Sequence, residues 1–432
     1  MRWSFAFRNL QRNRRRTLAT GAAVVAGFVG LSLLGGYILR VESSLRANAI
    51  YLQHKGHLTL FRKEGLQRFS TRPSKYLIRY SEFEALQGLL REHESKIDWV
   101  GQSLSGSGLI SNGERSVPFL ATGVDLQTLE KSYQNSFVKT WARDFFTPET
   151  ALFIQAVRSD PHAISVTKRL AALVRRSPPF QDLPLEQRSI QLAGFTVFGD
   201  LNAVEANLSV THTTGLELAE DSGLLAPLEL LQELFAAEGY QSVMLFLKEG
   251  VSHRKLAETL KAGLELHRLD LEVYPFDDPQ ISPNYVGSMG FLYAMAAFFV
   301  FLICGAVALS IVNSLTMGIL ERIREIGTFR AIGYGHHQLA WMMTQEALAL
   351  TLISSGVGTA VAMTISAVIN SLNIRFSPPG IATSLQFVLA PQVSLLLFVF
   401  MSLFVLIGIT AYVVTYWKLK VKIVDLLTDV GA

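Results

Sequence analysis

The sequence is poor in cysteine and in charged residues. It holds one cysteine, Cys304, so an intrachain disulfide and a metal site built from several cysteines are both excluded. Only 17% of the 432 residues are charged and 50% are apolar, whereas about a quarter of an ordinary soluble protein is charged. The mean hydropathy is positive. These figures indicate a membrane protein, in which Cys304 is expected to be a small apolar core residue.

Charge is missing altogether from two long segments, Leu18–Leu39 and Val286–Leu320. A membrane-spanning helix needs about 20 apolar residues. We therefore predict transmembrane helices at 18–40 and 286–320, with two more at 341–372 and 392–417. At ~1.5 Å per residue the second run makes ~50 Å of helix, more than the ~30 Å hydrocarbon core, so part of it should project from the membrane.

The first span is predicted to be a retained anchor rather than a signal peptide. Its apolar run is longer than the roughly 7–15 residues of a signal core, and Arg40, Val41 and Glu42 follow it in place of a small-residue cleavage site. Small residues allow transmembrane helices to approach closely. Close helix contact is therefore expected at the glycines of this span, Gly21, Gly27, Gly30, Gly35 and Gly36.

Acidic residues are absent before Glu42, whereas six arginines lie within the first 16 residues. Such a cluster can mark nucleic-acid binding, but here it adjoins an uncharged run, which favours a topology signal. Because positive flanks stay in the cytoplasm, we expect residues 1–17, the segment 321–340 and the tail 418–432 to be cytoplasmic, and 41–285 and the short loop 373–391 to be extracytoplasmic. Lys418, Lys420 and Lys422 agree with this orientation, and Trp3, Phe7 and Leu10 have the spacing of a short basic amphipathic helix on the inner leaflet.

The segment 41–285 has the pattern of a large folded domain with mixed secondary structure. Its periodicity predicts strands at 56–62, 242–248 and 270–278 and helices at 81–97, capped by Ser81, at 223–239 and at 252–268. Asn112-Gly113 suits a tight primed turn in a hairpin over 107–125, and 163–176 reads as a strand leading into a helix. We expect an α+β domain rather than a barrel.

Catalytic and phosphate-binding motifs are missing from the sequence. It contains no G-x-S-x-G and no G-x-x-x-x-G-K-[ST], and His93-Glu94 lacks the second histidine of a zinc protease motif. His54 and His57 have no acidic partner nearby in sequence. The residues therefore give no support to an enzyme, and we expect no catalytic residue, metal or cofactor in this chain.

A charged segment separates the second and third predicted spans. "ERIREIGTFR", residues 321–330, holds two acids and three arginines, and as a helix it would bring Glu321 and Arg324 within pairing distance. Its apolar residues recur at intervals of three and can pack on the inner membrane surface or on a partner: Ile323, Ile326, Phe329 and Ile332. Two interpretations follow, a basic loop on the inner leaflet or a docking element for another protein.

This segment resembles the cytoplasmic signature E-R-x-R-E-I-G-x-x-R-A-x-G of FtsX-like and MacB-like permeases of type VII ABC transporters. The layout of one span, a large outer domain and three further spans is similar too, and "TTGLELAEDSGLLAPLELLQELF" (213–235) resembles the lipoprotein-releasing branch. "TQEALAL" (344–350) also looks like the family and carries Glu346, for which a position at the interface and a structural partner are equally open. The residues that match the signature are Glu321, Arg322, Arg324, Glu325, Ile326, Gly327, Arg330, Ala331 and Gly333.

The resemblance implies a multi-pass permease subunit of the bacterial inner membrane, with both termini cytoplasmic and a MacB-like periplasmic domain over 41–285. A separate ABC ATPase would bind ATP and Mg²⁺ and dock on the nine matching residues. A second permease, identical or paralogous, would complete the transporter, with membrane lipids and a periplasmic adaptor or cargo protein as further partners.

Two functions are open under this resemblance. ATP hydrolysis would drive movements of the periplasmic domain for export or extraction of lipoproteins or other amphiphilic cargo. Alternatively, those movements would regulate a periplasmic partner such as a cell-wall hydrolase by mechanotransmission, without transport. A third interpretation, a membrane-anchored adhesion or sensor domain without an ATPase, leaves the 321–333 signature unexplained.

Overall fold

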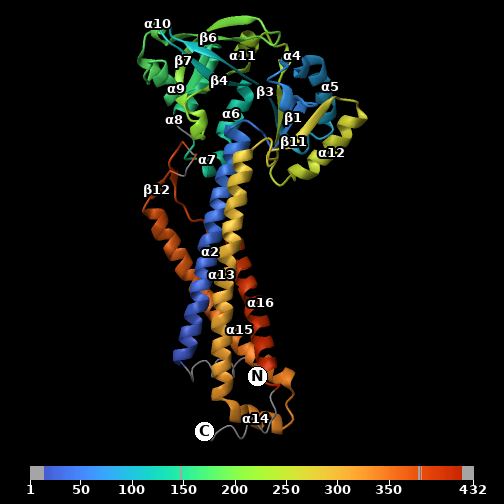
Figure 1. Ribbon diagram of the computed structural model, residues 1–432, viewed down its shortest axis with the longest axis vertical. Coiled ribbons are helices and arrows are strands. Elements are labelled where there is room, and N and C mark those ends of the chain that lie inside the picture. Colours follow the sequence, from blue (N-terminus) through green and yellow to red (C-terminus); the bar gives the residue numbers. More distant parts are fainter. Residues whose placement is uncertain (1–13, 146–147, 378–379, 381, 421–432) are drawn as a thin grey trace. The chain divides into compact units, whose positions relative to one another are not determined.

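The computed structural model describes residues 14–145, 148–377, 380 and 382–420 and divides into two compact units (Figure 1). The helical unit comprises 1–41, 290–374 and 387–432, and the mixed unit comprises 42–289 and 375–386. The predicted amphipathic helix with Trp3, Phe7 and Leu10, and also Lys422, lie outside the described residues.

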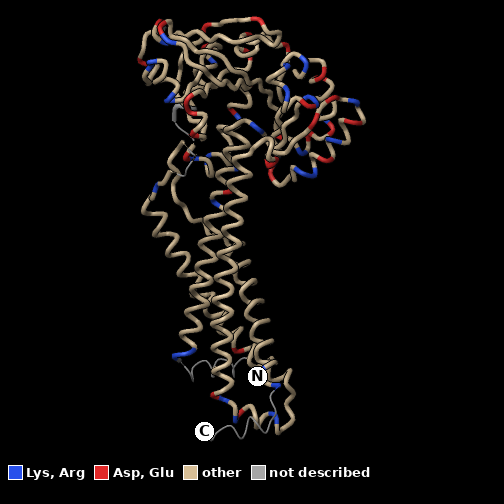
Figure 2. Tube along the Cα trace, in the orientation of Figure 1, with Lys and Arg blue, Asp and Glu red and all other residues tan. Residues whose placement is uncertain are grey.

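Four long apolar helices are present among the described residues: α2 (Arg14–Ala47), α13 (Pro283–Glu321), α15 (His336–Ser371) and α16 (Val393–Lys418). Each is long and apolar enough to cross a membrane, as the four predicted spans require. Figure 2 shows how few charged residues lie along them. Helix α15 begins before the expected residue 341, because Gln338 Oε1 accepts a hydrogen bond from Gly335 N (3.2 Å) at its first turn.

The predicted close contacts of the α2 glycines are present in the helical unit. A Cβ on Gly27 would lie 2.6 Å from Val307 Cγ2 of α13, and one on Gly35 would lie 2.7 Å from Leu395 Cδ1 of α16. Around these contacts the unit has a core of buried side chains from all four helices, among them Val24, Phe28, Val307, Ile311, Ala347, Leu403 and Ile407. The missing side chains of the glycines therefore set how closely α2 packs on its neighbours.

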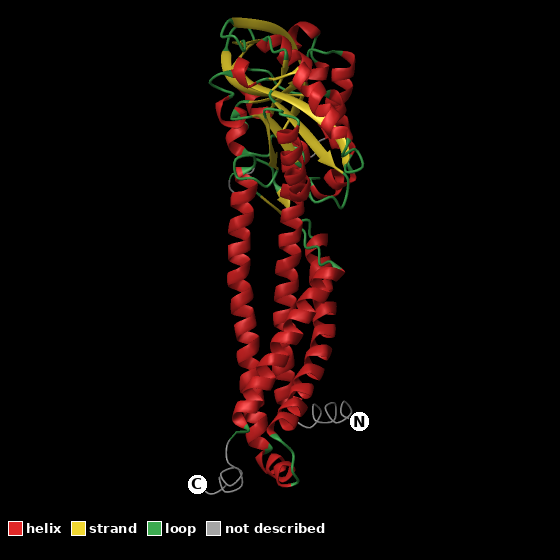
Figure 3. Cartoon of the chain, turned by 90° about the vertical axis from the view of Figure 1, so that its right-hand side faces the viewer, coloured by secondary structure: helices red, strands yellow, loops and turns green. Residues whose placement is uncertain are grey.

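The mixed unit is built on a nine-stranded sheet, shown in Figure 3. The strand order is β11-β1-β10-β3-β4-β8-β5-β7-β6, and β6 also pairs with β3, so the strands from β3 to β6 in this order close into a ring. The strands are β1 (Leu58–Arg62), β3 (Ile97–Ser111), β4 (Ser116–Val124), β5 (Ala163–Thr167), β6 (Ser189–Phe195), β7 (Leu201–His212), β8 (Gly223–Pro227), β10 (Ser242–Leu247) and β11 (Leu271–Pro275), with a separate pair β2 (Ile78–Arg79) and β9 (Gly239–Tyr240).

Glycine makes this ring closure possible. Gly108 of β3 lies opposite Gly194 of β6, and a Cβ on Gly108 would lie 2.2 Å from the carbonyl oxygen of Ala193. A larger residue at Gly108 would push the two strands apart. The predicted α+β class is confirmed, but the expectation that the domain contains no barrel is wrong, because six strands of the sheet close into a ring.

Helices pack on the sheet through buried apolar faces. Leu86 of α5 (Tyr80–Arg91) and Leu260 of α12 (His253–Leu266) pack with residues of β1 and β10 in one cluster. The other helices of this unit are α3 (Gly65–Arg68), α4 (Pro73–Tyr76), α6 (Leu126–Gln134), α7 (Ser136–Trp141), α8 (Pro148–Ser159), α9 (Lys168–Leu173), α10 (Leu185–Arg188), α11 (Leu228–Phe235) and the short turns η1 (Asn48–Leu52), η2 (Phe180–Asp182) and η3 (Glu217–Ala219).

Three local predictions in this unit need correction. The helix expected over 223–239 is split, because its first five residues form the fully buried strand β8 and only Leu228–Phe235 is helical. Arg79, not Ser81, precedes helix α5, and its backbone N–H donates to the Glu82 carboxylate at 3.0 Å. The hairpin of β3 and β4 is confirmed, but four residues, 112–115, connect the strands in place of a two-residue turn.

The loop expected at 373–391 is more than a connection. It contains the strands β12 (Arg375–Phe376) and β13 (Leu385–Gln386), which pair with each other and belong to the mixed unit. Asp144 Oδ2 accepts a hydrogen bond from the backbone N–H of Gln386 (3.2 Å), and Leu385 is buried in a cluster with Phe246. We call residues 375–386 the strap.

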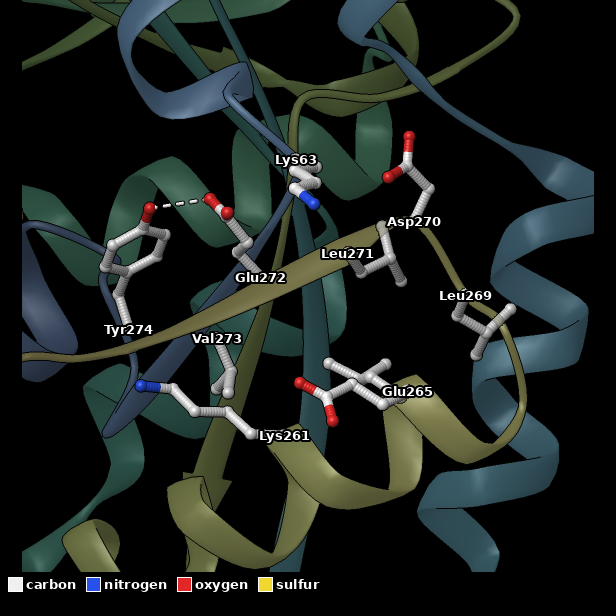
Figure 4. A pocket seen from close by; sticks show the side chains of 10 residues that line it. Lys63, Lys261, Glu265, Leu269, Asp270, Leu271, Glu272, Val273 and Tyr274 are labelled. Carbon is white, nitrogen blue, oxygen red and sulfur yellow. Dashed lines mark hydrogen bonds between the residues drawn. The ribbon is translucent and has the colours of Figure 1, made fainter.

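Strand β11 is an edge of the described sheet, and a surface hollow of about 380 Å³ lies beside it (Figure 4). Lys261, Glu265 and Asp270 line this hollow together with apolar residues of β11. Tyr274 donates a hydrogen bond to the Glu272 carboxylate at 2.7 Å. Charged side chains of both signs beside an open edge oppose pairing with a further strand.

Candidate coupling site

The signature segment forms a second helix at the end of α13. Helix α13 ends at Glu321, Arg322 leaves the helical conformation (φ −110°, ψ 20°), and α14 (Ile323–Ala331) follows. The helix predicted across the segment is therefore present in two pieces. The break at Arg322 also interrupts the continuous helical spacing on which a Glu321–Arg324 pair was predicted.

Gly333 ends α14 in a Schellman motif. Its φ is +102°, its N–H donates to the carbonyl of Arg330 (3.0 Å), and the N–H of Tyr334 donates to the carbonyl of Phe329 (3.0 Å). The left-handed conformation favours glycine at this position. The chain then turns into α15 at Gly335, so α14 is a short, well-terminated helix between two long ones.

One face of α14 is buried within the helical unit. Ile326 is 3% exposed and packs in a cluster with Ile319, Leu339, Met343 and Leu419. This corrects the prediction that the apolar residues of the segment face the membrane or a partner, because Ile326 packs on α13, α15 and the end of α16. Ile332, in contrast, is 72% exposed.

The hinge between α13 and α14 holds a buried ion pair. Arg322 Nη1 lies 3.2 Å from Glu346 Oε1 and 3.3 Å from Oε2, and the two side chains are 10% and 13% exposed. A charge this deep is stable only when it is paired. The structure thus assigns Glu346 a structural partner, which the sequence left open, and connects the hinge to α15.

A second pair connects the hinge to α2. Arg16 Nη1 donates to Glu321 Oε2 at 2.8 Å, and the Arg16 guanidinium crosses α13 at Gly318, where a Cβ would lie 2.8 Å from Nη1. Sequence reasoning missed Arg16 as a site residue, because its partner is 305 positions away. The glycine that makes room for it carries no local signal.

The signature residues divide into two sets. Arg322, Ile326 and Gly327 are buried, whereas Glu321, Arg324, Glu325, Ala331 and Gly333 are exposed. Arg330 is half-buried, and its Nη1 donates to the carbonyl of Leu419 just after α16 (3.3 Å). The inward set fixes α14 on α13, α15 and the end of α16, and the outward set presents charges of both signs on its surface.

Polar contacts join the hinge and α14 to other helices of this unit. Among the described residues no group of three or more histidine, cysteine, aspartate or glutamate side chains is placed to hold a metal ion. The hinge and α14 contact α2 through Arg16, α15 through Glu346 and the end of α16 through Arg330.

Comparison with known proteins agrees with this arrangement. Residues 297–418 match the model of the FtsX-like permease C-terminal family. This range includes α14 and three of the four residues that form the two charge pairs of the hinge; only Arg16 lies outside it. An uncharacterised ABC transporter permease of Methanocaldococcus jannaschii is 27% identical over 158 residues, which are 35% of this chain and 39% of that protein.

Two solved structures resemble about half of the chain. The periplasmic region of MacB from Actinobacillus actinomycetemcomitans has a TM-score of 0.31 and 13% identity, covering 51% of this chain and 88% of that one. The extracellular domain of the noncanonic ABC-type transporter YknZ from Gram-positive bacteria has the same score and identity, covering 50% and 98%. Likenesses this weak carry no argument about partner or cargo.

Four apolar helices with a large α+β unit between the first two define a multi-pass membrane protein. Within that class, residues 297–418 match the FtsX-like permease C-terminal family, and part of the chain is similar to an ABC transporter permease.

Proposed function

We propose that this chain is the membrane subunit of an ABC transporter of the FtsX and MacB type, and that a separate ATPase docks on the outer face of α14. The observation that carries the proposal is the division of α14 into a face fixed on the long helices and a charged face that includes Arg324 and Glu325. A docking helix needs a face that contacts the partner and a face that is anchored in its own protein, since a contact that is not anchored transmits no movement.

Transmission to the mixed unit would follow the long helices. Helices α2 and α13 each run unbroken through the residues at which the two units divide, 41/42 and 289/290. A continuous helix carries a displacement along its axis because every turn is hydrogen-bonded to the next. ATP-driven closure of two ATPases, one on each of two permeases, would in this way move the mixed units.

We propose further that cargo is handled at the outer face of the bacterial inner membrane, with the N-terminus, α14 and the C-terminus in the cytoplasm. The basic flanks support this orientation. The resemblance of 213–235 to the lipoprotein-releasing branch supports lipoproteins or other amphiphilic molecules as the cargo.

The first prediction tests docking. Glu325→Lys reverses a charge on the exposed face of α14, so it should abolish co-purification of an ABC ATPase with the tagged chain from native membranes in mild detergent. Glu84→Lys makes the same change on an exposed position of α5 in the mixed unit and should leave co-purification unchanged.

The mass spectrum of the wild-type complex decides the outcome. A stoichiometric ATPase that is lost only with Glu325→Lys supports the proposal, and lipoproteins in the same complex support the proposed cargo. An ATPase with a cell-wall hydrolase and no amphiphile would favour mechanotransmission. An intact chain without any ATPase, or an ATPase retained by Glu325→Lys, would contradict docking on α14.

A further inference from the structure

The mixed unit contains a cavity that plays no part in the proposed coupling. Its volume is about 230 Å³, and it lies where the turn after η1 meets the ends of β7 and β8. His54, Lys55 and His212, whose side chains carry nitrogen atoms, are among the residues that line it, and so is Tyr133. None of the residues that line it is an aspartate or glutamate.

His54 is the unusual member of this wall. Its side chain is 5% exposed, yet neither ring nitrogen has a hydrogen-bond partner among the described residues. A buried polar group without a partner loses its hydration and gains nothing in return. Its backbone is also left-handed, with φ at +51°, a conformation that non-glycine residues adopt at a cost. Two unfavourable features at one residue indicate a role other than stability.

The charged and titratable neighbours make the cavity suitable for an anion. Burial lowers the pKa of Lys55, and no ion pair of this lysine is found in the described part of the chain. Burial also lowers the pKa of His54 to about 3, with His212 and Lys55 as further causes, and that of His212 to about 4. The imidazoles are therefore neutral at neutral pH and each can donate one N–H, and an anion would offset the unfavourable burial of Lys55.

Glu220, which follows the lining residue Ala219 in sequence, is bound within its own loop. Glu220 is buried, and its Oε1 accepts hydrogen bonds from Thr213 Oγ1 (2.9 Å), Thr214 N (2.7 Å) and Thr214 Oγ1 (2.8 Å). The ring of His212 is held by Ser165, whose Oγ lies 2.9 Å from Nδ1. The His212 ring is thus held in place, while the Glu220 carboxylate is occupied within its own loop.

The remaining wall is partly apolar, although Gln53, Thr122, Thr213 and Thr214 also belong to it. Its apolar residues include Leu120, Phe145, Leu216 and Leu225, whose side chains offer no hydrogen bond to a ligand. A bare inorganic ion would leave this surface unused, whereas a molecule with an anionic group and a short apolar part would contact both kinds of wall.

We propose that this cavity binds a small amphiphilic carboxylate, with its anionic group at His54 and Lys55 and its apolar part against Phe145 and the leucines. A metal ion is a poor alternative, because two histidines are the only strong ligands in the wall and no larger group was found among the described residues. The inference is independent of the ATPase and of the proposed function.

The test uses the full chain in lipid nanodiscs and butyrate as the probe, since this short carboxylate partitions weakly into lipid. Saturation-transfer NMR and calorimetry measure its binding, with inorganic phosphate and butanol as probes that lack the apolar part or the charge. Wild type should bind butyrate better than either. Lys55→Met removes the charge and should weaken butyrate binding about tenfold or more.

Two further variants complete the test. His54→Leu should weaken butyrate binding while leaving the melting temperature equal to or above that of wild type, because it removes an unpartnered buried group. Lys139→Met, at an exposed position of α7, makes the same substitution as Lys55→Met outside the cavity and should bind like wild type.

Two kinds of result would contradict the proposed binding site or its ligand class. Absence of butyrate binding to wild type, or equal binding by wild type, Lys55→Met and His54→Leu, would overturn the site. Phosphate binding as tight as butyrate binding would overturn the proposed ligand class, because the apolar wall would then contribute nothing.

Discussion

At the scale of single residues, the charges near the inner end of the helices are held in specific pairs. Arg322 and Glu346 are both nearly buried, whereas Arg16 and Glu321 are partly exposed. A surface pair contributes little to stability, but breaking a buried pair leaves one charge without compensation. The two pairs therefore join the hinge to different helices with different strengths.

Glu346→Ala should reduce the stability of the chain. It leaves the buried Arg322 guanidinium without its carboxylate, and we expect a loss of about 3 kcal/mol in the free energy of unfolding in mixed micelles. The double variant Arg322→Met, Glu346→Leu should regain most of this loss, because it removes both charges. Equal stability of Glu346→Ala and wild type would show that the pair is solvated.

Because His57 is buried, we expect the stability of the mixed unit to depend on pH. Burial lowers its pKa to about 3, with Arg46 and His253 as further causes, and its Nδ1 accepts the N–H of Leu247 at 3.1 Å. The unfolded state gains a proton below about pH 6.5, whereas the folded state does so only near its lowered pKa. Stability is thus fully present above about pH 6.5 and falls as the pH decreases towards 3.

This dependence can be measured by pulse proteolysis in urea at pH values of about 7 and about 5. Wild type should be less stable at the lower pH. His57→Asn keeps an acceptor for Leu247 but cannot take up the proton, so its loss between the two pH values should be smaller. A loss as large as that of wild type would mean that other groups, such as His54 and His212, account for the whole effect.

At the scale of elements, close helix packing depends on glycine residues, which have no side chain. Helix α2 approaches α13 at Gly27 and α16 at Gly35, in both cases within the distance that a methyl group would occupy. The spacing of small residues along one helix indicates which face carries them. Only the neighbouring helix determines how much space is left beside those residues. The α2 contacts are therefore the most sensitive packing points of the helical unit.

Gly27→Ala should destabilise the helical unit by about 1–3 kcal/mol, because the added methyl group overlaps Val307. Gly305→Ala on α13 is the matched control, since a Cβ there has nothing within 4 Å, and it should not be destabilising. Thermal unfolding in detergent measures both. Combining Gly27→Ala with Val307→Ala should restore stability, and failure to do so would place the strain elsewhere.

At the scale of the whole molecule, the chain passes between its two units four times, since the strap returns to the mixed unit between α15 and α16. Asp144 holds the strap at both of its strands, through the N–H of Gln386 and through Arg375, whose Nη2 lies 4.0 Å from Oδ1. The Asp144 side chain is 5% exposed, so its hydrogen bond is protected from water.

Asp144→Ala should release the end of the strap. Hydrogen exchange followed by mass spectrometry should show faster exchange of the Gln386 amide, because that N–H loses its acceptor. Asp144→Asn is the matched control: it keeps an oxygen acceptor and loses only the charge, so exchange should stay close to that of wild type. The same rate in all three proteins would mean that the strap is held by its buried Leu385 instead.

The sequence by itself determined the four spans, the α+β class and the position of the signature, because charge-free runs, periodicity and motif spacing are local properties of the chain. The tertiary structure decided which residues act together. Residues 223–227 are apolar in a way that suits a buried helix or a buried strand, and pairing with β4 and β5 made them a strand. Arg16 and Glu321, Arg322 and Glu346, and His54 and His212 meet only because distant elements pack, and no local pattern encodes those distances.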